Sequence, residues 1–449
     1  MTFALPVIVA FLVAMAGIGV WHARRVHSSE DFRLAGRNVA APVLAGTLVA
    51  TWIGTGSLFG NSEFTYLNGS AGFLLPLSGI VGMLLLAWLA PRVRDLPAGS
   101  VPEILGLRFG ATARTLSAIA ILLAYLVIVS YQYRAGAAVA ERLFPGMDQT
   151  TLRIGFAGFI ILYTALAGLI SVIWTDVING IVLGTGLVVG AALAWSGWNA
   201  AVGPAGGALA GPSEALGTLT WINVMLPPFL LILGDANMFQ RFMAAGSPRA
   251  ARRAAFGAAA ALLVLESAII GIAFASRILL PEAPANPGHA IIDMAFTVFP
   301  PAVGLLLVAT TVAVIVSTAD SYLLVSATTA AADLAGTRPT PTTQRLLVVV
   351  FGLFALLPAF LWEEFLSVAL YAYTLYGASL TPAVLAALLR PATSGRAVVG
   401  GMIAGLGTAL VWKVLLDASV LGAALSTVDP VLPALGANTL VLVVLELRR

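Results

Sequence analysis

The sequence predicts an all-α protein that crosses a membrane many times, and two observations carry this prediction. Of the 449 residues, 60% are hydrophobic and only 10% are charged, and the mean hydropathy is +0.99. Soluble domains carry about 25% charged residues. Apolar runs near or above the roughly 20 residues that cross a bilayer recur along the whole chain. Together these observations disfavour a single soluble domain with buried helices.

Thirteen apolar runs predict thirteen transmembrane helices in one membrane domain over residues 1–449. The first run, at 3–21, has no basic stretch before it and no small-residue cleavage site, so we expect a retained helix rather than a signal peptide. The chain has no cysteine, which excludes disulfides and thiol chemistry. The other predicted spans are 39–61, 71–91, 113–142, 153–171, 175–197, 222–242, 254–280, 301–331, 345–362, 364–389, 397–416 and 430–447.

The placement of arginines predicts the orientation of these helices. Near the opposite side of the predicted bundle there are only Arg142, Arg153, Arg277 and Lys413. Because basic loops stay in the cytoplasm, we expect the N-terminus outside and the C-terminus inside, in a bacterial inner membrane. The net charge of +3 does not indicate a nucleic-acid partner. The loops of the basic side hold Arg24, Arg25, Arg33, Arg37, Arg92, Arg94, Arg108, Arg114, Arg241, Arg249, Arg252, Arg253, Arg338, Arg345, Arg390, Arg396, Arg448 and Arg449.

Two of the predicted spans contain breaks in their helical pattern. The stretch VATWIGTGSLFGNSEFTY at 49–66 is interrupted at Gly54 to Ser57, and the span at 222–242 is interrupted at Pro227-Pro228 and again at Gly234 to Asn237. An unpaired backbone group facing lipid costs several kcal/mol, so we expect these breaks to line a polar cavity. The alternative is that the glycines only permit close helix packing.

The positions of the two breaks predict an inverted repeat. They lie in the second and seventh spans, which run in opposite directions through the membrane. Residues 39–197 and 222–389 would then form two five-helix halves, with one extra helix at 3–21 before them and two at 397–447 after them. This pattern is typical of secondary transporters that bind solute and ion at broken helices near the bilayer midplane.

A dense polar patch occurs in the ninth span, in VAVIVSTADSYLLVSATT at 312–329. Ser317, Asp320 and Ser321 share one helix face, and Thr318 is adjacent. Hydroxyl and carboxylate oxygens suit a small hard cation such as Na⁺, and an Asp inside a membrane span is a functional candidate by default. The hydroxyls could alternatively bond back to the carbonyls one turn earlier, which does not account for Asp320.

A second acidic residue, Asp176, stands at the predicted start of the sixth span. It could be a plain N-cap or could have a further role. Two other charged residues, Arg134 and Glu266, lie inside predicted spans; each could be a gating residue, part of a buried pair, or a snorkelling side chain.

Four motifs in order along the chain resemble the sodium:solute symporter family. They are SSEDFRLAGRNV at 28–39, YTALAGLISVIWTDVINGIV at 163–182, NMFQRFMAAGS at 237–247 and VSTADSYLL at 316–324. The resemblance covers essentially the whole chain. It implies the leucine-transporter architecture, with a ten-helix core, and sodium-driven uptake of a solute by alternating access.

The resemblance also implies where Na⁺, the co-transported ion, binds. Backbone oxygens would come from Ala50 and Ile53 before the first break and from Val314, and hydroxyl oxygens would come from Ser317 and Thr318. Some relatives have a second sodium site. Here Asp176, Asp320 and Ser321, together with Ser317, could form such a site or a proton site, although Asp320 replaces a hydroxyl of the best-known version.

The solute site implied by the family lies between the two broken helices. The segment ATWIGTG resembles the choline transporters of the family, and the face of Trp52 would suit a cation. Asp235 adds a negative charge, although those relatives carry a Trp near its position. We therefore expect an amine, an amino acid or a quaternary ammonium compound; alternatively, Trp52 is a packing residue and Asp235 only caps the second half of its helix. The candidates are Trp52, Thr55, Ser57, Tyr131, Gln132, Asp235, Asn237, Phe239, Tyr371 and Tyr373.

The expected partners are a small-molecule solute, Na⁺ and membrane lipid, and nothing in the sequence indicates an oligomeric state. We do not expect an enzyme, because the polar residues are scattered through span centres rather than gathered at a membrane surface. Two alternative functions stay open at this point. One is a proton-coupled carrier that uses Asp176 or Asp320, and the other is a membrane sensor that works with a separate signalling partner.

Overall fold

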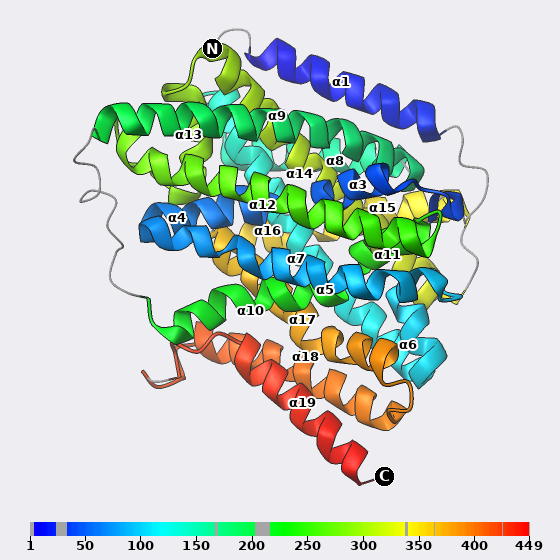
Figure 1. Cartoon of the computed structure of the whole chain (residues 1–449). Helices are drawn as coiled ribbons and strands as arrows, with labels where there is room; N and C mark the ends of the chain where they lie inside the picture. The colour runs from blue at the N-terminus through cyan, green and yellow to red at the C-terminus, as the bar shows by residue number, and fades with distance from the viewer. Residues whose placement is uncertain are drawn as a thin grey trace.

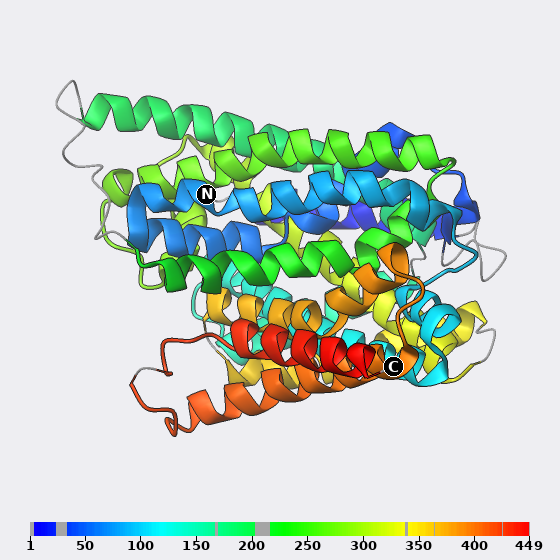
Figure 2. The ribbon, with the colours of Figure 1, turned by 60° about the horizontal axis from the view of Figure 1, so that its bottom comes forward.

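Long helices run side by side through the whole molecule (Figures 1 and 2). A computed structural model describes residues 4–23, 34–166, 169–202, 216–336, 340–362, 364–423 and 425–448. Within these residues the only extended pairing is an isolated bridge between Val39 and Ala245. The predicted all-α fold is confirmed. Most of the basic stretch after the first helix, residues 24–33, lies outside the described part of the chain.

The helices of the first half of the chain follow the predicted spans closely. The second predicted span is divided among α3, the π-helix η2, α4 and η3, which continues to Leu74 instead of ending at 61. The bounds are α1 Ala4–Ala23, α3 Ala41–Trp52, η2 Gly56–Asn61, α4 Ser62–Asn68, η3 Gly69–Leu74, α5 Pro76–Asp95, α6 Val101–Phe109, α7 Ala111–Leu143, α8 Gln149–Leu166 and α9 Leu169–Val202.

The second half of the chain begins with another interrupted helix. The bounds are α10 Thr218–Gly234, α11 Ala236–Ala244, α12 Pro248–Leu279, α13 Ala290–Thr297, α14 Pro301–Thr329, α15 Pro341–Phe354, α16 Leu356–Leu361, α17 Phe365–Leu389, α18 Gly395–Asp417 and α19 Val431–Leu447. A π-helical turn, Ala330–Leu334, extends α14. Helix α1 lies along α9 at one edge of the molecule, and α18 and α19 pack together at the opposite edge (Figure 1).

In the described residues, ten helical segments are long and apolar enough to cross a membrane, and the bent segment from α3 to η3 makes eleven. Helix α19 is apolar but has only 17 residues, and α1 is an apolar helix of 20 residues. The chain is therefore a multi-pass membrane protein. The full count of thirteen crossings stays a prediction.

Both predicted breaks exist, but they differ in form. At the first break Ile53 is extended, with φ −72° and ψ 93°, and the segments on its two sides meet at an angle of 56°. At the second break only Asp235 leaves the helical conformation, with φ −59° and ψ 120°. The expected interruption at Pro227-Pro228 is wrong, since α10 continues through both prolines. The φ of proline fits a helix, and its missing N–H only frees the carbonyl of the residue four positions earlier, which membrane helices tolerate.

Two short helices, α6 and α13, were not predicted as elements because they do not span a membrane. Helix α6 begins after the N-cap residue Ser100, whose hydroxyl accepts from the N–H of Glu103 at 3.1 Å, and the Glu103 carboxylate accepts from the N–H of the preceding Gly99 at 2.8 Å. The sequence SVPE carries this signal. Helix α6 packs against α7.

Candidate functional site

The end of α3 meets α14 where the sodium site is predicted. The hydroxyl of Ser317 donates to the carbonyl of Ala50 over 3.4 Å. A methyl group added at Gly54 would lie only 3.1 Å from the Thr318 hydroxyl oxygen, so the first break packs directly on that residue. The Thr318 hydroxyl is buried without a hydrogen-bond partner among the described residues. The first break thus contacts α14 at two adjacent residues, Ser317 and Thr318.

The other two predicted sodium ligands fit this geometry by their place in the backbone. Ile53 follows the last turn of α3, and its extended conformation takes its carbonyl out of the helical hydrogen-bond pattern. Val314 lies one turn before Thr318 on α14, and both are buried. Backbone and hydroxyl oxygens are the ligands that hard cations prefer.

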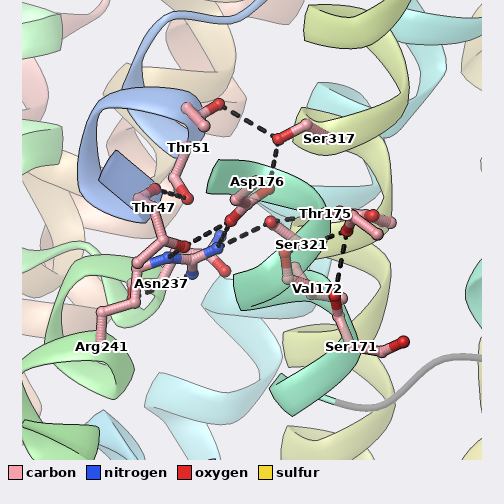
Figure 3. A network of polar contacts seen from close by, with 12 residues as sticks. Thr47, Thr51, Ser171, Val172, Thr175, Asp176, Asn237, Arg241, Ser317 and Ser321 are labelled. Atoms are coloured by element: carbon pink, nitrogen blue, oxygen red, sulfur yellow. Dashed lines mark hydrogen bonds and ion pairs between the residues drawn. The ribbon is translucent and has the colours of Figure 1, made fainter. Parts of the chain in front are cut away.

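A buried ionic network lies beside this region and joins four helices (Figure 3). The Arg241 guanidinium of α11 is 3.0 Å from the Asp176 carboxylate of α9, and both side chains are fully buried. Arg241 also donates to the hydroxyls of Thr47 on α3 and Ser321 on α14, each over 2.9 Å. Asp176 accepts from Thr47 and from Ser317 as well.

The interpretation of Asp176 as an N-cap is wrong. Helix α9 begins at Leu169, so Asp176 lies in its third turn rather than at its start. Leu169 to Trp174 form a helix rather than a loop because they continue the apolar pattern of the span. Asp176 is instead an interior carboxylate whose negative charge is balanced by Arg241.

The predicted second ion site contains this guanidinium. Arg241 contacts both Asp176 and Ser321. Asp320 accepts from the Ser321 hydroxyl at 3.3 Å, and its second oxygen is buried without a partner among the described residues. The guanidinium of Arg241 therefore contacts two of the four residues predicted for this site, and a second Na⁺ or proton site here stays a prediction.

A cavity lies between the two broken helices. Three of the residues predicted for the solute site line it: Trp52 and Ser57 of the first break and Tyr373 of α17. The indole of Trp52 packs on Gly79, where an added methyl group would lie 2.8 Å from its ring nitrogen. The full lining is Trp52, Gly56, Ser57, Asn61, Leu75, Pro76, Ser78, Gly79, Val224, Pro228, Leu231, Glu266, Tyr322, Leu366, Ala369, Leu370 and Tyr373.

The acidic residue at this cavity is Glu266 of α12, rather than Asp235. Ser57 donates to one carboxylate oxygen of Glu266 at 2.7 Å, and Asn61 donates to the other at 3.1 Å. The residue is only 2% exposed, so the snorkelling alternative is wrong. Sequence reasoning did not place it in the site, because 209 positions separate it from Ser57.

Three further candidates, Thr55, Gln132 and Tyr131, do not line the cavity but hold the elements that do. The hydroxyl of Thr55 donates to the side-chain carbonyl of Gln132 on α7, which joins the first break to that helix. The hydroxyl of Tyr131 is 3.3 Å from that of Tyr373. These contacts position the break and the tyrosine that faces the cavity.

Asp235 caps the second half of its helix, as the alternative interpretation expected. Its carboxylate accepts from the N–H of Asn237 at 3.2 Å and from the hydroxyl of Tyr125. Sequence reasoning missed Tyr376 of α17, whose hydroxyl accepts from the N–H of Ala236 at 2.9 Å and donates to the carbonyl of Gly234 at 2.8 Å. Tyr376 thus pairs the backbone groups on both sides of the break.

The remaining candidates do not line the cavity. Tyr371 precedes Tyr373 by two residues and so lies about 200° round the helix from it; it faces Trp362 and Lys413 instead. Phe239 is fully buried in the hydrophobic core. Asn237 is also fully buried, and both polar atoms of its side chain lack partners among the described residues.

Solved structures share this fold. A structure of a Na⁺-coupled sialic acid symporter in a substrate-bound outward-open state matches with a TM-score of 0.79 at 19% identity, and the match covers 98% of this chain and 97% of that one. Mhp1, a nucleobase-cation-symport-1 family transporter in a closed conformation with bromovinylhydantoin bound, matches with a TM-score of 0.64 at 16% identity, over 93% of this chain and 94% of its own. The chain therefore has the leucine-transporter fold.

Curated relatives identify the family among proteins with this fold. The high-affinity proline transporter PutP of Bacillus subtilis (strain 168) is 26% identical over 88% of this chain and 89% of its own length. The sodium/proline symporter of Escherichia coli (strain K12) is 25% identical over 92% and 89%. The sodium/sialic acid symporter SiaT of Proteus mirabilis (strain HI4320) is 28% identical over 41% and 37%. The profile of the sodium:solute symporter family matches residues 32–405. The chain belongs to this family, and it is a sodium-coupled solute symporter rather than an enzyme.

Proposed function

We propose that the protein imports a small organic amine, amino acid or quaternary ammonium compound by alternating access, driven by inward movement of Na⁺. Na⁺ would bind the backbone oxygens of Ala50, Ile53 and Val314 and the hydroxyls of Ser317 and Thr318. The observation that carries this proposal is the buried Thr318 hydroxyl, which has no partner in the described residues and faces the first break. The solute would occupy the adjacent cavity and contact Trp52.

The class of solute is proposed from the cavity and from the relatives together. Two relatives that match most of the chain are described as proline transporters, and proline carries an amine. The aromatic rings of Trp52, Tyr322 and Tyr373 line the cavity, and such rings bind ammonium groups through cation–π contacts. Amines, amino acids and quaternary ammonium compounds are therefore the solutes to test first.

Uptake by proteoliposomes tests the coupling ion. We expect accumulation with an inward Na⁺ gradient and none when K⁺ replaces Na⁺. In the Thr318→Ala and Ser317→Ala variants the apparent Na⁺ affinity should fall by roughly tenfold or more, because each change removes an ion ligand worth about 1.4 kcal/mol or more. Solute affinity should fall less, through coupling between the two sites. Uptake driven by a pH gradient without Na⁺ would favour the proton-coupled alternative, and Na⁺-dependent binding without uptake would favour a sensor.

A further inference from the structure

We propose that Glu266 binds the ammonium group of the solute and that the site selects organic monocations over zwitterions and carboxylates. This inference rests on the proposed function, because it assigns the chemistry of the same cavity. It adds a residue that neither the sequence motifs nor the comparisons assign. It also narrows the solute to a small primary to quaternary ammonium ion without a carboxylate.

Glu266 is a buried carboxylate that lacks a cationic partner. The ion pairs in the described residues join Arg114 with Asp333, Arg142 with Asp293, Arg241 with Asp176 and Lys413 with Asp417, and none of them includes Glu266. Its two hydrogen bonds come from neutral donors, Ser57 and Asn61. An isolated buried charge is strongly unfavourable unless a counter-charge balances it. A cationic solute in the cavity would supply that counter-charge.

The carboxylate retains the capacity to accept further hydrogen bonds. A carboxylate offers about four lone-pair positions, and two of those on Glu266 are used by the first broken helix. Ser57 and Asn61 both belong to η2, so they hold the carboxylate toward the break. An N–H of a bound ammonium group would reach a free position of the same oxygens.

The rest of the cavity suits a cation and offers nothing for a carboxylate. Three aromatic residues, Trp52, Tyr322 and Tyr373, line it together with Glu266, and no Arg, Lys or His occurs among its described lining residues. Cation–π attraction to the rings would add to the charge of Glu266. A solute carboxylate would face Glu266 without a basic partner, which costs binding energy.

Asp235, the residue that the sequence suggested for this task, has other contacts. It accepts from the hydroxyl of Tyr125 and caps α11, and it is fully buried outside the cavity lining. Removal of its charge would disturb the second break rather than the solute pocket. The two carboxylates therefore have separable effects.

Matched ligand pairs test the proposal on the purified full-length protein. Isothermal titration in Na⁺ would compare choline with its uncharged isostere 3,3-dimethylbutan-1-ol, and pyrrolidine with proline, within a wider panel of small ammonium ions. We expect the cation of each pair to bind more tightly. In Glu266→Gln the affinity for the cations should fall roughly 10- to 100-fold, and the preference within each pair should shrink. Glu266→Asp should retain part of the preference because the charge is kept.

Controls separate this inference from the proposed function. Glu282→Gln, an exposed loop change, should leave all affinities unchanged. Stabilisation by Na⁺ alone, measured as a thermal shift, should persist in Glu266→Gln. Equal cation affinity in Glu266→Gln and the parent protein, binding of proline but not of ammonium ions, or loss of the Na⁺ shift in Glu266→Gln would each overturn the role of Glu266. An absence of Na⁺-driven uptake of any solute would instead overturn the proposed function.

Discussion

Single buried hydroxyls hold the second broken helix in place. An interrupted helix leaves backbone donors and acceptors without partners, and such groups are costly inside a membrane. Tyr376 satisfies one N–H and one carbonyl at the same time, and the Thr381 hydroxyl donates to the carbonyl of Leu230 at 2.6 Å. The two hydroxyls lie on α17, and the Tyr125 hydroxyl of α7 adds a bond to Asp235 at the same break.

Removal of the Tyr376 hydroxyl should destabilise the protein. Tyr376→Phe leaves Gly234 and Ala236 with a buried unpaired carbonyl and N–H, and each such group costs about 1–3 kcal/mol. We expect a clear fall in the apparent melting temperature in detergent. The matched control is Tyr371→Phe on the same helix, because within the described part of the chain its hydroxyl does not bond to the break and its ring faces Lys413. Equal effects of the two changes would contradict the assigned role of Tyr376.

The ion pair between Asp176 of α9 and Arg241 of α11 should contribute to the stability of the protein and should leave the number of ions transported per solute unchanged. Asp176→Asn leaves Arg241 as a buried charge without its partner, which costs about 3–5 kcal/mol. We expect a large loss of stability and an unchanged ratio of charge to solute in electrical recordings. Asp176→Asn combined with Arg241→Met should recover part of the lost stability, because the isolated charge is then gone. A ratio that falls in Asp176→Asn would instead support the predicted second ion site.

A histidine outside the membrane-spanning segments connects the first broken helix to α17. The His289 ring packs against those of Phe59 and Phe365, with centroid distances of 6.0 and 5.8 Å. Burial lowers the pKa of His289 from 6.5 to about 4, against the opposing effect of Asp293. The folded state therefore favours the neutral ring, so the stability that it contributes is complete above pH 6.5 and is lost as the pH falls toward 4.

Acidification should thus weaken the packing of the His289 ring against Phe59 and Phe365. Between pH 6.5 and 4 we expect the free energy of unfolding to fall by on the order of 1–3 kcal/mol, since one pKa unit corresponds to about 1.4 kcal/mol. Melting temperatures measured across this range check it. In His289→Phe the ring packing is kept and the titration is removed, so the pH-dependent part of the loss should disappear. The same pH slope in both proteins would contradict the prediction.

The elements could be predicted where a single stretch of chain carries the signal. Span lengths follow from apolar runs, and the breaks follow from Gly54, Gly56 and Gly234. The error at Pro227-Pro228 arose because proline fits a helix whose freed carbonyls are tolerated. The error at Asp176 arose because the polar residue was taken as the helix boundary, whereas the apolar pattern starts earlier.

The site could be predicted only in part, because its contacts join distant segments. Ser317 and Thr318 were found from a local motif, and the structure places them against the first break. Glu266 and Tyr376 carry no local signal: their partners lie 209 and 142 positions away in the chain. Asp235 carried a strong local signal and proved to be a cap.

Across the whole molecule, the cavity and the ionic network lie on opposite sides of the breaks. The lining residues Val224, Leu366 and Leu370 belong to the starts of α10 and α17. Arg241 belongs to α11, beyond the second break, and ties it to α3, α9 and α14. In this conformation the solute cavity therefore extends toward the face of the protein where α10 and α17 begin. The buried ionic network lies between the breaks and the opposite face.

Thiol labelling tests whether the cavity side is the outside of the cell, as the arginine distribution predicts. The chain has no cysteine, so single cysteines can be introduced without background. Arg249 is exposed in the first turn of α12 and Glu282 is exposed in the loop after its end, so the two positions lie at opposite ends of that helix. In intact cells a membrane-impermeant maleimide should label Glu282→Cys, and it should label Arg249→Cys only after permeabilisation. Leu370→Cys should also react from outside, and a bound solute should slow that reaction because Leu370 lines the cavity. The reverse pattern at positions 249 and 282 would mean that the basic loops face outward and that solute enters the cavity from the cytoplasm.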